Sequence, residues 1–188
     1  MDYKIILASN SPRRKELLQG LDIDFEVRII PDIDESYPSG TSPEDIPSFI
    51  AKKKAEAYKS TMKEDELVIT ADTVVVLDGE ILEKPDDKND AIQMIKRLSG
   101  RKHTVITAVV LTTVKKNKEF SVMSTVDFSE LTDEEIEYYV EKYKPFDKAG
   151  AYGIQEWIGY VGVRGIEGSF YNVMGLPVQR LYRELKVF

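Results

Sequence analysis

The sequence predicts a protein of the α/β or α+β class built on a mixed β-sheet. Short apolar runs that read as buried strands alternate with stretches in which apolar residues recur at helical spacing. Two runs rich in β-branched residues flank a short polar turn, as in an antiparallel pair. At 188 residues the chain is long enough to bury a core without disulfides or metal, and no linker divides it. We therefore expect a single domain over residues 1–188.

In the first half of the chain, strands and helices are expected to alternate. Lys4–Ala8 is a short apolar run typical of a buried strand. Ser11 and Pro12 then supply the N-cap and the first-turn proline of a helix that stops at Gly20. The other elements expected here are a strand at Phe25–Ile30, a helix that begins at Ser42-Pro43, a strand at Leu67–Leu77 and a hairpin turn at Asp78-Gly79.

In the second half, helices flank one predicted pair of strands. Seven of the 11 glycines fall between Gly150 and Gly175, which predicts tight turns and close backbone approach there. The regular elements expected are a helix at Asn89–Leu98, antiparallel strands at Val105–Thr113 and Phe120–Phe128, a helix from a capping box at Thr132 and Glu135 to about Lys142, and a last helix that begins near Pro177.

Composition excludes several classes of protein. With 33 acidic and 26 basic residues the net charge is −7, which argues against a protein that coats duplex nucleic acid. The chain has no cysteine and one histidine, His103, so disulfides, thiolate zinc sites and multi-histidine metal sites are excluded. Residues 1–11 lack the apolar core of a signal peptide, and no run approaches the roughly 18 apolar residues of a membrane span. We therefore expect a soluble cytoplasmic protein with no nucleic-acid or membrane partner.

The stretch Ser9-Asn-Ser-Pro-Arg-Arg14 places Arg13 and Arg14 in the first turn of a helix that follows a strand. Backbone N–H groups at such a helix start attract an anion, whereas cationic side chains there oppose the helix dipole. A bound triphosphate would neutralise both guanidinium groups through bidentate hydrogen bonds. The alternative is a solvated pair of surface arginines.

Asp72 lies inside the apolar run Leu67–Leu77, where a carboxylate is costly to bury unless it is paired or bound to metal. Such a residue is a candidate general base or metal ligand. Glu35, in the acidic segment Asp32–Glu35, could supply a second oxygen ligand for a hard divalent cation. The alternatives are strand alternation that points Asp72 to solvent, and an ordinary solvated acidic loop.

Two lysines could add positive charge to such a site. Lys54 follows Ile50 by one helical turn, so it lies beside the apolar stripe and can reach into a cleft. Lys84 precedes Pro85 at the end of the predicted hairpin, where it could bind phosphate. Ordinary surface charge is the alternative for both, and His103 fits a structural or surface role better than that of a base. Together these residues favour phosphate-ester or nucleotide chemistry without naming a substrate.

Recognisable motifs follow one another along nearly the whole chain. They are Leu7–Leu18 (LASNSPRRKELL), Asp34-Glu35, Lys54-Ala55, Ala71–Val75 (ADTVV), Lys84-Pro85, Ser99–His103 (SGRKH), Asp147–Gln155 (DKAGAYGIQ) and Gly168–Pro177 (GSFYNVMGLP). In sequence and in order these motifs resemble those of the Maf family of nucleoside triphosphate pyrophosphatases. The resemblance implies an elongated, two-lobed α/β fold with a mixed, twisted sheet, flanking helices and a deep central cleft, like that of the ITPases.

The resemblance also implies an activity, namely hydrolysis of a nucleoside triphosphate to the monophosphate and pyrophosphate by a cytoplasmic homodimer. A divalent cation, magnesium or manganese, is the implied cofactor. The residues that carry over are Asp72 as catalytic base, Glu35 with Asp72 as metal ligands, Arg13, Thr73 and Gln155 for base specificity, and Ser9, Arg14, Lys54 and Lys84 for substrate binding.

Asp72-Thr73 and Tyr152–Gln155 resemble the branch of the family that acts on dTTP and UTP. The expected substrates are therefore these nucleotides and modified pyrimidine nucleotides, whose hydrolysis prevents misincorporation. Glu83 and Glu156 depart from the family pattern, because glycine is usual at both positions. A purine house-cleaning pyrophosphatase for ITP or XTP is the alternative enzyme. A non-enzymatic regulator of septum formation, linked to cell-division arrest, is the alternative from another class.

Overall fold

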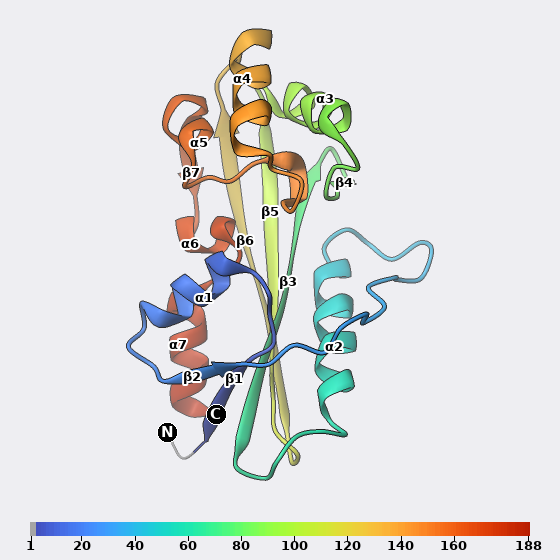
Figure 1. Ribbon diagram of the computed structural model, residues 1–188, viewed down its shortest axis with the longest axis vertical. Helices are drawn as coiled ribbons and strands as arrows, with labels where there is room; N and C mark the ends of the chain where they lie inside the picture. The colour runs from blue at the N-terminus through green and yellow to red at the C-terminus, as the bar shows by residue number, and fades with distance from the viewer. Residues whose placement is uncertain (1–2) are drawn as a thin grey trace. The chain divides into compact units, whose positions relative to one another are not determined.

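Seven β-strands form one mixed sheet within residues 3–188, the part of the chain that the computed structural model describes. The strand order is β2-β1-β3-β5-β6-β7, with β4 paired to β3. Helices flank the strands (Figure 1), which confirms the predicted class of fold. The strands are β1 (Lys4–Leu7), β2 (Phe25–Val27), β3 (Glu66–Leu77), β4 (Glu80–Leu82), β5 (Lys102–Thr112), β6 (Asn117–Phe128) and β7 (Val163–Glu167). The helices are α1 (Pro12–Gln19), α2 (Ile46–Tyr58), α3 (Lys88–Leu98), α4 (Asp133–Tyr143), the 3-10 turn η1 (Ala149–Ala151), α5 (Trp157–Gly162), α6 (Phe170–Met174) and α7 (Val178–Val187).

The chain forms two compact units, and the long strands β3, β5 and β6 contribute to both. The first unit contains the described residues up to Thr73 together with Thr107–Val122 and Gly175–Phe188. The second unit contains Val74–Ile106 and Met123–Met174. Of the residues expected to be functional, Lys84 and Gln155 therefore belong to the second unit and the others to the first.

In the first unit, β1 pairs in parallel with a strand on each side. Ile5 is in register with Phe25 of β2 and with Leu67 of β3. Every residue of β1 after Lys4 is buried, as expected of a parallel strand covered on both faces. Figure 1 shows α2 on one side of these strands and α1 and α7 on the other. The continuous apolar runs predicted as buried strands are thus explained by helical cover on both faces.

Small side chains position α2 against the sheet. Ala51 and Ala55 of α2 pack against Ala108 and Val110 of β5, and all four residues are buried. Alanine at the contact lets a helix approach a sheet closely, because it adds little bulk. This packing fixes the face of α2 from which Lys54 projects.

The second unit begins with the hairpin predicted at Asp78-Gly79. Both residues have positive φ, 52° and 82°, which matches the turn type that asparagine, aspartate and glycine favour between two strands. Thr132 and Glu135 form the predicted capping box at the start of α4. Helix α3 packs against α4 and against η1. Strand β7 completes the unit by pairing antiparallel with β6.

The helix predicted from Ser42-Pro43 begins later than expected, at Ile46. The carbonyl of Ser42 accepts hydrogen bonds from the N–H groups of Asp45 and Ile46, at 3.0 and 3.2 Å, and so closes a separate turn. Pro47 then occupies the first turn of α2, where its missing N–H costs no helical hydrogen bond.

The strand predicted at Phe25–Ile30 ends at Val27. Beyond that point the hydroxyl of Tyr58 donates to the carbonyl of Arg28 at 2.7 Å and accepts from the N–H of Ile30 at 3.0 Å. A side chain from α2 therefore pairs with the Arg28 carbonyl and the Ile30 N–H in place of a strand, which sequence periodicity does not reveal.

The glycine-rich region, for which the sequence predicts tight turns, also contains regular structure, namely η1, α5, β7 and α6. The close approach expected there is present at Gly159, where an added Cβ would lie 1.7 Å from the carbonyl oxygen of Ile154. Within residues 3–188, no helix combines the length and the apolar character that a membrane span requires.

Candidate active site

Asp72 is buried within the first unit and paired with a lysine. The residue is 9% exposed to solvent, and its Oδ1 lies 2.9 Å from the Nζ of Lys54 on α2. The same Nζ lies 3.1 Å from Oε1 of Glu35, which is half exposed. The fold thus brings together Asp72, Lys54 and Glu35, three of the residues predicted to be functional. Strand alternation does not point Asp72 to solvent, so that alternative is wrong.

The protein raises the pKa of the Asp72 carboxyl above its ordinary value. Burial is the main cause, because it disfavours the charged form. The positive charges of Lys54 and Arg14 and the hydrogen bond from Lys54 lower the pKa but do not outweigh burial, and the nearby charge of Glu35 raises it further. A carboxylate with a raised pKa is a stronger base than an exposed aspartate, and its cationic neighbours keep it able to ionise.

Arg14 is held by oxygen atoms of the protein rather than solvated at the surface. Its Nε donates to the carbonyl of Gly175 at 2.8 Å, its Nη1 to the carbonyl of Ala71 at 2.9 Å, and its Nη2 to Oγ1 of Thr73 at 3.0 Å. These three contacts use three of the five N–H groups of a guanidinium. The alternative of a freely solvated arginine pair is therefore wrong for Arg14.

Thr73 connects Arg14 to the neighbouring strand. Its Oγ1 accepts from Arg14 and lies 2.9 Å from Oγ1 of the fully buried Thr107 on β5. Because the guanidinium can only donate, the hydroxyl hydrogen of Thr73 is free to point to Thr107 or elsewhere. Thr73 is partly exposed, and its Oγ1 is held between Arg14 and Thr107.

The start of α1 has the geometry that the sequence predicts. Ser11 is the N-cap, and its Oγ accepts from the N–H of Arg14 at 3.4 Å. Oγ of Ser9 accepts from the N–H of Ser11 at 3.2 Å. Arg13 projects from the first turn and is partly buried. A turn of backbone amides beside two arginines is a suitable place for a phosphate.

In the second unit, Gln155 lies at the centre of a tight turn. The N–H of Glu156 donates to the carbonyl of Gly153 at 2.9 Å and closes the turn Gly153–Glu156. Oε1 of Gln155 is buried and has no hydrogen-bond partner among residues 3–188. A buried acceptor without a partner costs free energy, which is recovered only when a donor binds it.

Lys84 is exposed on the segment between β4 and α3. The carbonyl of the preceding Glu83 accepts from the N–H of Gly150 at 3.1 Å. That contact ties the lysine-bearing segment to η1 through the backbone of Glu83.

The departure from the family pattern at Glu156 also has a structural explanation. Its carboxylate accepts a hydrogen bond from the hydroxyl of Tyr139, and its Oε1 lies 3.3 Å from Nζ of Lys148. Sequence reasoning identified Glu156 as unusual but missed Tyr139 and Lys148 as its partners. The only sequence signal for Tyr139 is its place on the apolar face of α4 beside Val140, which does not distinguish it from a core residue.

His103 has a structural role, as expected. It is buried, its Nε2 lies 2.6 Å from the hydroxyl oxygen of Tyr152, and its ring meets those of Phe128 and Tyr152 edge to face. Burial lowers the pKa of His103 to about 4, so the ring is neutral at physiological pH.

The carboxylates near Lys54 are the candidate ligands for a divalent cation. Residues 3–188 contain no group of three or more histidine, cysteine, aspartate or glutamate side chains arranged to hold a metal ion. Asp72 and Glu35 instead offer two carboxylates on either side of one ammonium group. Magnesium and manganese commonly bind one or two carboxylates together with substrate phosphates. The donor set therefore fits a cation that arrives with a triphosphate.

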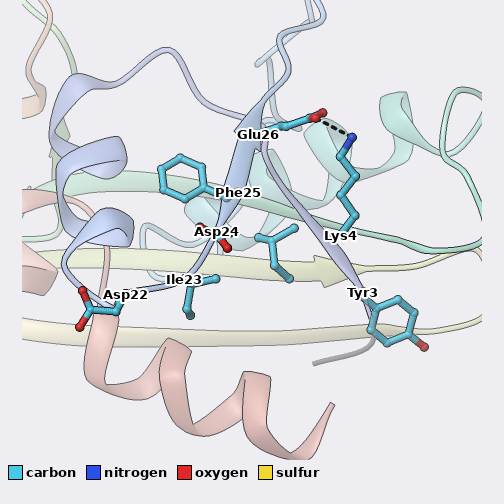
Figure 2. A pocket seen from close by; sticks show the side chains of 8 residues that line it. Tyr3, Lys4, Asp22, Ile23, Asp24, Phe25 and Glu26 are labelled. Atoms are coloured by element: carbon cyan, nitrogen blue, oxygen red, sulfur yellow. Dashed lines mark ion pairs between the residues drawn. The ribbon is translucent and has the colours of Figure 1, made fainter.

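A cavity of about 540 Å³ lies elsewhere in the first unit, beside β1 and β2 (Figure 2). Its lining carries the ion pair between Lys4 and Glu26, with Nζ and Oε1 2.5 Å apart. Asp22 and Asp24 add negative charge. None of the residues predicted to be functional lines this cavity, and its acidic character does not suit a triphosphate.

Comparison with known proteins gives the chain its family. Residues 4–188 match the family described as Maf-like protein. A protein of Phocaeicola vulgatus named dTTP/UTP pyrophosphatase is 62% identical over 98% of this chain and 95% of its own length. Proteins of Porphyromonas gingivalis and Flavobacterium johnsoniae with the same name are 57% and 47% identical, over 99% and 97% of this chain and 94% of their own lengths.

A solved structure shares the fold. The HAM1 protein from Coxiella burnetii superposes with a TM-score of 0.51 over 99% of this chain and 100% of its own, at 14% sequence identity. At that identity the likeness concerns the fold alone. The match to the family model over nearly all residues, together with the highly identical relatives, establishes that this chain is a member of the Maf family.

Proposed function

We propose that this chain hydrolyses dTTP and UTP, and modified pyrimidine triphosphates, to the nucleoside monophosphate and pyrophosphate. One observation carries the proposal: Asp72 is buried, has a raised pKa, and lies beside Lys54 and Arg14. This is the arrangement that general-base catalysis beside a polyanion requires. The names of the relatives support the substrate, and the length of their matches supports residues 1–188 acting as one enzyme domain.

Asp72 acts as the base in the proposed reaction. Its carboxylate takes a proton from water, and the water oxygen forms a bond to the α-phosphorus. The bond between the α-phosphorus and the bridging oxygen breaks, and pyrophosphate leaves. Such phosphoryl chemistry depends on positioning and on neutralisation of charge rather than on covalent work by the protein.

Positive groups of the chain bind the phosphates and stabilise the leaving pyrophosphate. Lys54 holds Asp72 and supplies one charge. Arg14 is fixed by its three protein contacts, so its charge is delivered without loss of side-chain freedom during the reaction. We assign Lys84 to a further phosphate contact, Arg13 to a phosphate contact as well as to base selection, and the Ser9 hydroxyl to the binding of substrate near α1.

Gln155 selects the base through its unpaired acceptor. Thymine and uracil present a ring N–H, which Oε1 of Gln155 can accept. Cytosine has a lone pair at the same ring position and would leave the acceptor unsatisfied. This discrimination rests on an unpaired buried group, which is the kind of contact that rejects analogues most strongly. Thr73 and Arg13 complete the selection in this proposal.

A divalent cation is part of the proposal, with Asp72 and Glu35 as its protein ligands. When bound, it polarises the phosphate oxygens and neutralises charge on the leaving group. Lys54 bridges these two carboxylates in the structure, so it holds them close to one another and limits their mutual repulsion. We also propose that the protein acts in the cytoplasm and as a homodimer, which light scattering of the purified protein tests.

The experiment that tests the activity is release of pyrophosphate from a panel of nucleotides. The panel contains dTTP, UTP, 5-methyl-UTP, CTP, ITP, XTP, GTP and 7-methyl-GTP, with magnesium or manganese and with EDTA. Metal-dependent turnover that favours dTTP and UTP is expected. Preference for ITP or XTP would keep the reaction and overturn the base assignment. Absence of turnover with every nucleotide would reject the enzymatic proposal and favour the regulatory alternative.

A further inference from the structure

The turn that carries Gln155 is held by an internal hydrogen-bond network in the second unit. Gly153 and Glu156 form the ends of this turn, and the Glu156 N–H to Gly153 carbonyl bond closes it. Ile154 and Gln155 lie between these ends, and Ile154 is buried. The conformation of four residues therefore decides where the Gln155 amide points.

The hydroxyl of Tyr139 contacts both ends of this turn. It accepts from the N–H of Gly153 at 2.9 Å and donates to the carboxylate of Glu156. A phenol has one hydrogen to donate and lone pairs to accept, so both contacts can be made at once. Tyr139 is itself fully buried on α4 and stacked on Tyr143, with ring centroids 5.1 Å apart. The packing of the ring therefore holds the Tyr139 hydroxyl in one position.

Lys148 completes the network on the other carboxylate oxygen. Its Nζ lies 3.3 Å from Oε1 of Glu156 and 2.7 Å from Oδ1 of Asp147, and its side chain is only 9% exposed. An ion pair with one partner so well buried is screened weakly by solvent. Gly153 leaves room for the arrangement, since an added Cβ would lie 2.8 Å from the Glu156 carboxyl group.

We propose that Tyr139, through Glu156 and Lys148, is a positioning residue for base recognition by Gln155. The inference rests on the role of Gln155 under the proposed function and adds to it residues that do not contact substrate. The network keeps the turn in one conformation and so fixes the position of the unpaired Oε1 of Gln155. A preorganised acceptor discriminates between bases better than one on a mobile turn, because no ordering cost falls on binding.

The test compares Tyr139→Phe with Tyr143→Phe, which removes a hydroxyl from the stacked neighbouring ring on the same helix. The measured quantity is the ratio of kcat/KM for UTP to that for CTP, with the melting temperature of each variant. We expect Tyr139→Phe to lower the ratio about 3- to 10-fold, the effect of one lost hydrogen bond. The loss should appear mainly as a higher KM for UTP with little change in kcat. Tyr143→Phe should leave the ratio unchanged.

Glu156 provides a second, independent variant pair. Glu156→Ala removes both contacts of the carboxylate and should lower the ratio as much as Tyr139→Phe. Glu156→Gln retains an acceptor for the Tyr139 hydroxyl and should restore most of it. A role confined to stability would lower the melting temperature of these variants and leave the ratio unchanged, and that result would overturn the inference.

A double-mutant cycle separates this inference from the proposed function. Gln155→Ala alone should lower the ratio, and adding Tyr139→Phe to it should change the ratio less than about 2-fold. Additive effects would overturn the positioning role of Tyr139 and leave Gln155 as the base-reading residue. No effect of Gln155→Ala would instead refute the base-reading role itself, and with it the inference.

Discussion

Asp72 occupies a strand position whose neighbours are mostly apolar, and its burial raises the pKa of its carboxyl above the ordinary value. Lys54 has two effects on that carboxyl. It stabilises the ionised form by charge and hydrogen bond, and it occupies the space between Asp72 and Glu35. The acid–base behaviour of the protein at acidic pH should therefore depend on Lys54.

Replacing Lys54 by methionine is expected to move the acid limb of the kcat profile to higher pH. Under the proposed function Asp72 must be ionised to act as a base. Burial already raises its pKa, and loss of the lysine removes the main effect that lowers it. The measurement is kcat at saturating dTTP from pH 4 to 8. Lys53→Met is the matched control, because Lys53 pairs with Asp34 at 2.6 Å instead. An acid limb at the same pH in Lys54→Met and wild type would contradict this assignment.

For individual residues, the sequence predicts which side chains are functional candidates better than it predicts which groups they contact. Asp72 is conspicuous because a carboxylate within an apolar strand is costly. The partners of Arg14 cannot be predicted in this way, because two of them are backbone carbonyls, of Ala71 and Gly175, far from it in the chain. Backbone acceptors carry no residue-type signal, so only the fold reveals them.

Among the elements, the turn before α5 packs directly against Gly159 of that helix. Gly159→Ala would place a Cβ 1.7 Å from the carbonyl oxygen of Ile154. Either the turn or the helix must move, so we expect a loss of about 2 kcal/mol or more in the free energy of unfolding and a melting temperature lower by about 4–8 °C. Thermal unfolding followed by circular dichroism measures this.

Gly165→Ala is the control for that substitution, because nothing lies within 4 Å of an added Cβ at this strand position. It should leave the melting temperature within about 2 °C of wild type, the change expected of a surface substitution. Equal melting temperatures for Gly159→Ala and Gly165→Ala would show that the close approach does not constrain the turn.

The start of β3 is fixed by an ion pair between the buried Glu66 and the partly exposed Arg28. The two guanidinium nitrogens lie 2.8 and 2.6 Å from the carboxylate oxygens, and the hydrogen bond from Arg28 lowers the pKa of Glu66 to about 2. A carboxylate with a lowered folded-state pKa stabilises the fold fully above its unfolded pKa of about 4.5 and loses that contribution as pH falls toward 2.

Glu66→Gln should therefore destabilise the protein by about 2–3 kcal/mol at pH 7, in line with the pKa shift. The difference from wild type should shrink at pH 3.5, where wild type begins to lose the same contribution. Urea unfolding at both pH values measures it. Glu26→Gln, which breaks the exposed pair with Lys4, should cost less than about 1 kcal/mol. A pH-independent difference for Glu66→Gln would contradict the account.

The elements that the sequence predicts well are those with a local cause. Asp78-Gly79 forms its turn because both residues adopt positive φ, and Ser11 caps α1 through its own side chain. Elements with a tertiary cause are missed. Helix α6 is one of them: it is held by Asn172, whose Nδ2 donates to the carbonyl of Val105 at 3.2 Å and to Ser124 at 3.0 Å. Neither contact is visible in the helix's own five residues.

In the molecule as a whole, the predicted substrate-binding residues Ser9, Arg14 and Lys54 belong to the first unit, whereas Lys84 and the predicted base-reading Gln155 belong to the second. The long strands β3 and β5 run through both units, so each of these strands contributes residues to both units. Composition alone predicts neither cluster, since the net charge of −7 hides the local concentration of lysine and arginine near Asp72. Both sets of residues are instead predicted from the resemblance of the ordered motifs to those of the Maf family.

Whether Asp72 directs water to the α-phosphorus is tested by hydrolysis of dTTP in water labelled with oxygen-18, by purified wild type and Asp72→Asn, with magnesium and with EDTA. The products are identified by phosphorus NMR and mass spectrometry. We expect wild type to form equal amounts of dTMP and pyrophosphate with the label in dTMP, to stop in EDTA, and to lose at least about 100-fold in turnover in Asp72→Asn at an unchanged melting temperature. Turnover by Asp72→Asn near that of wild type, or release of inorganic phosphate in place of pyrophosphate, would contradict the account.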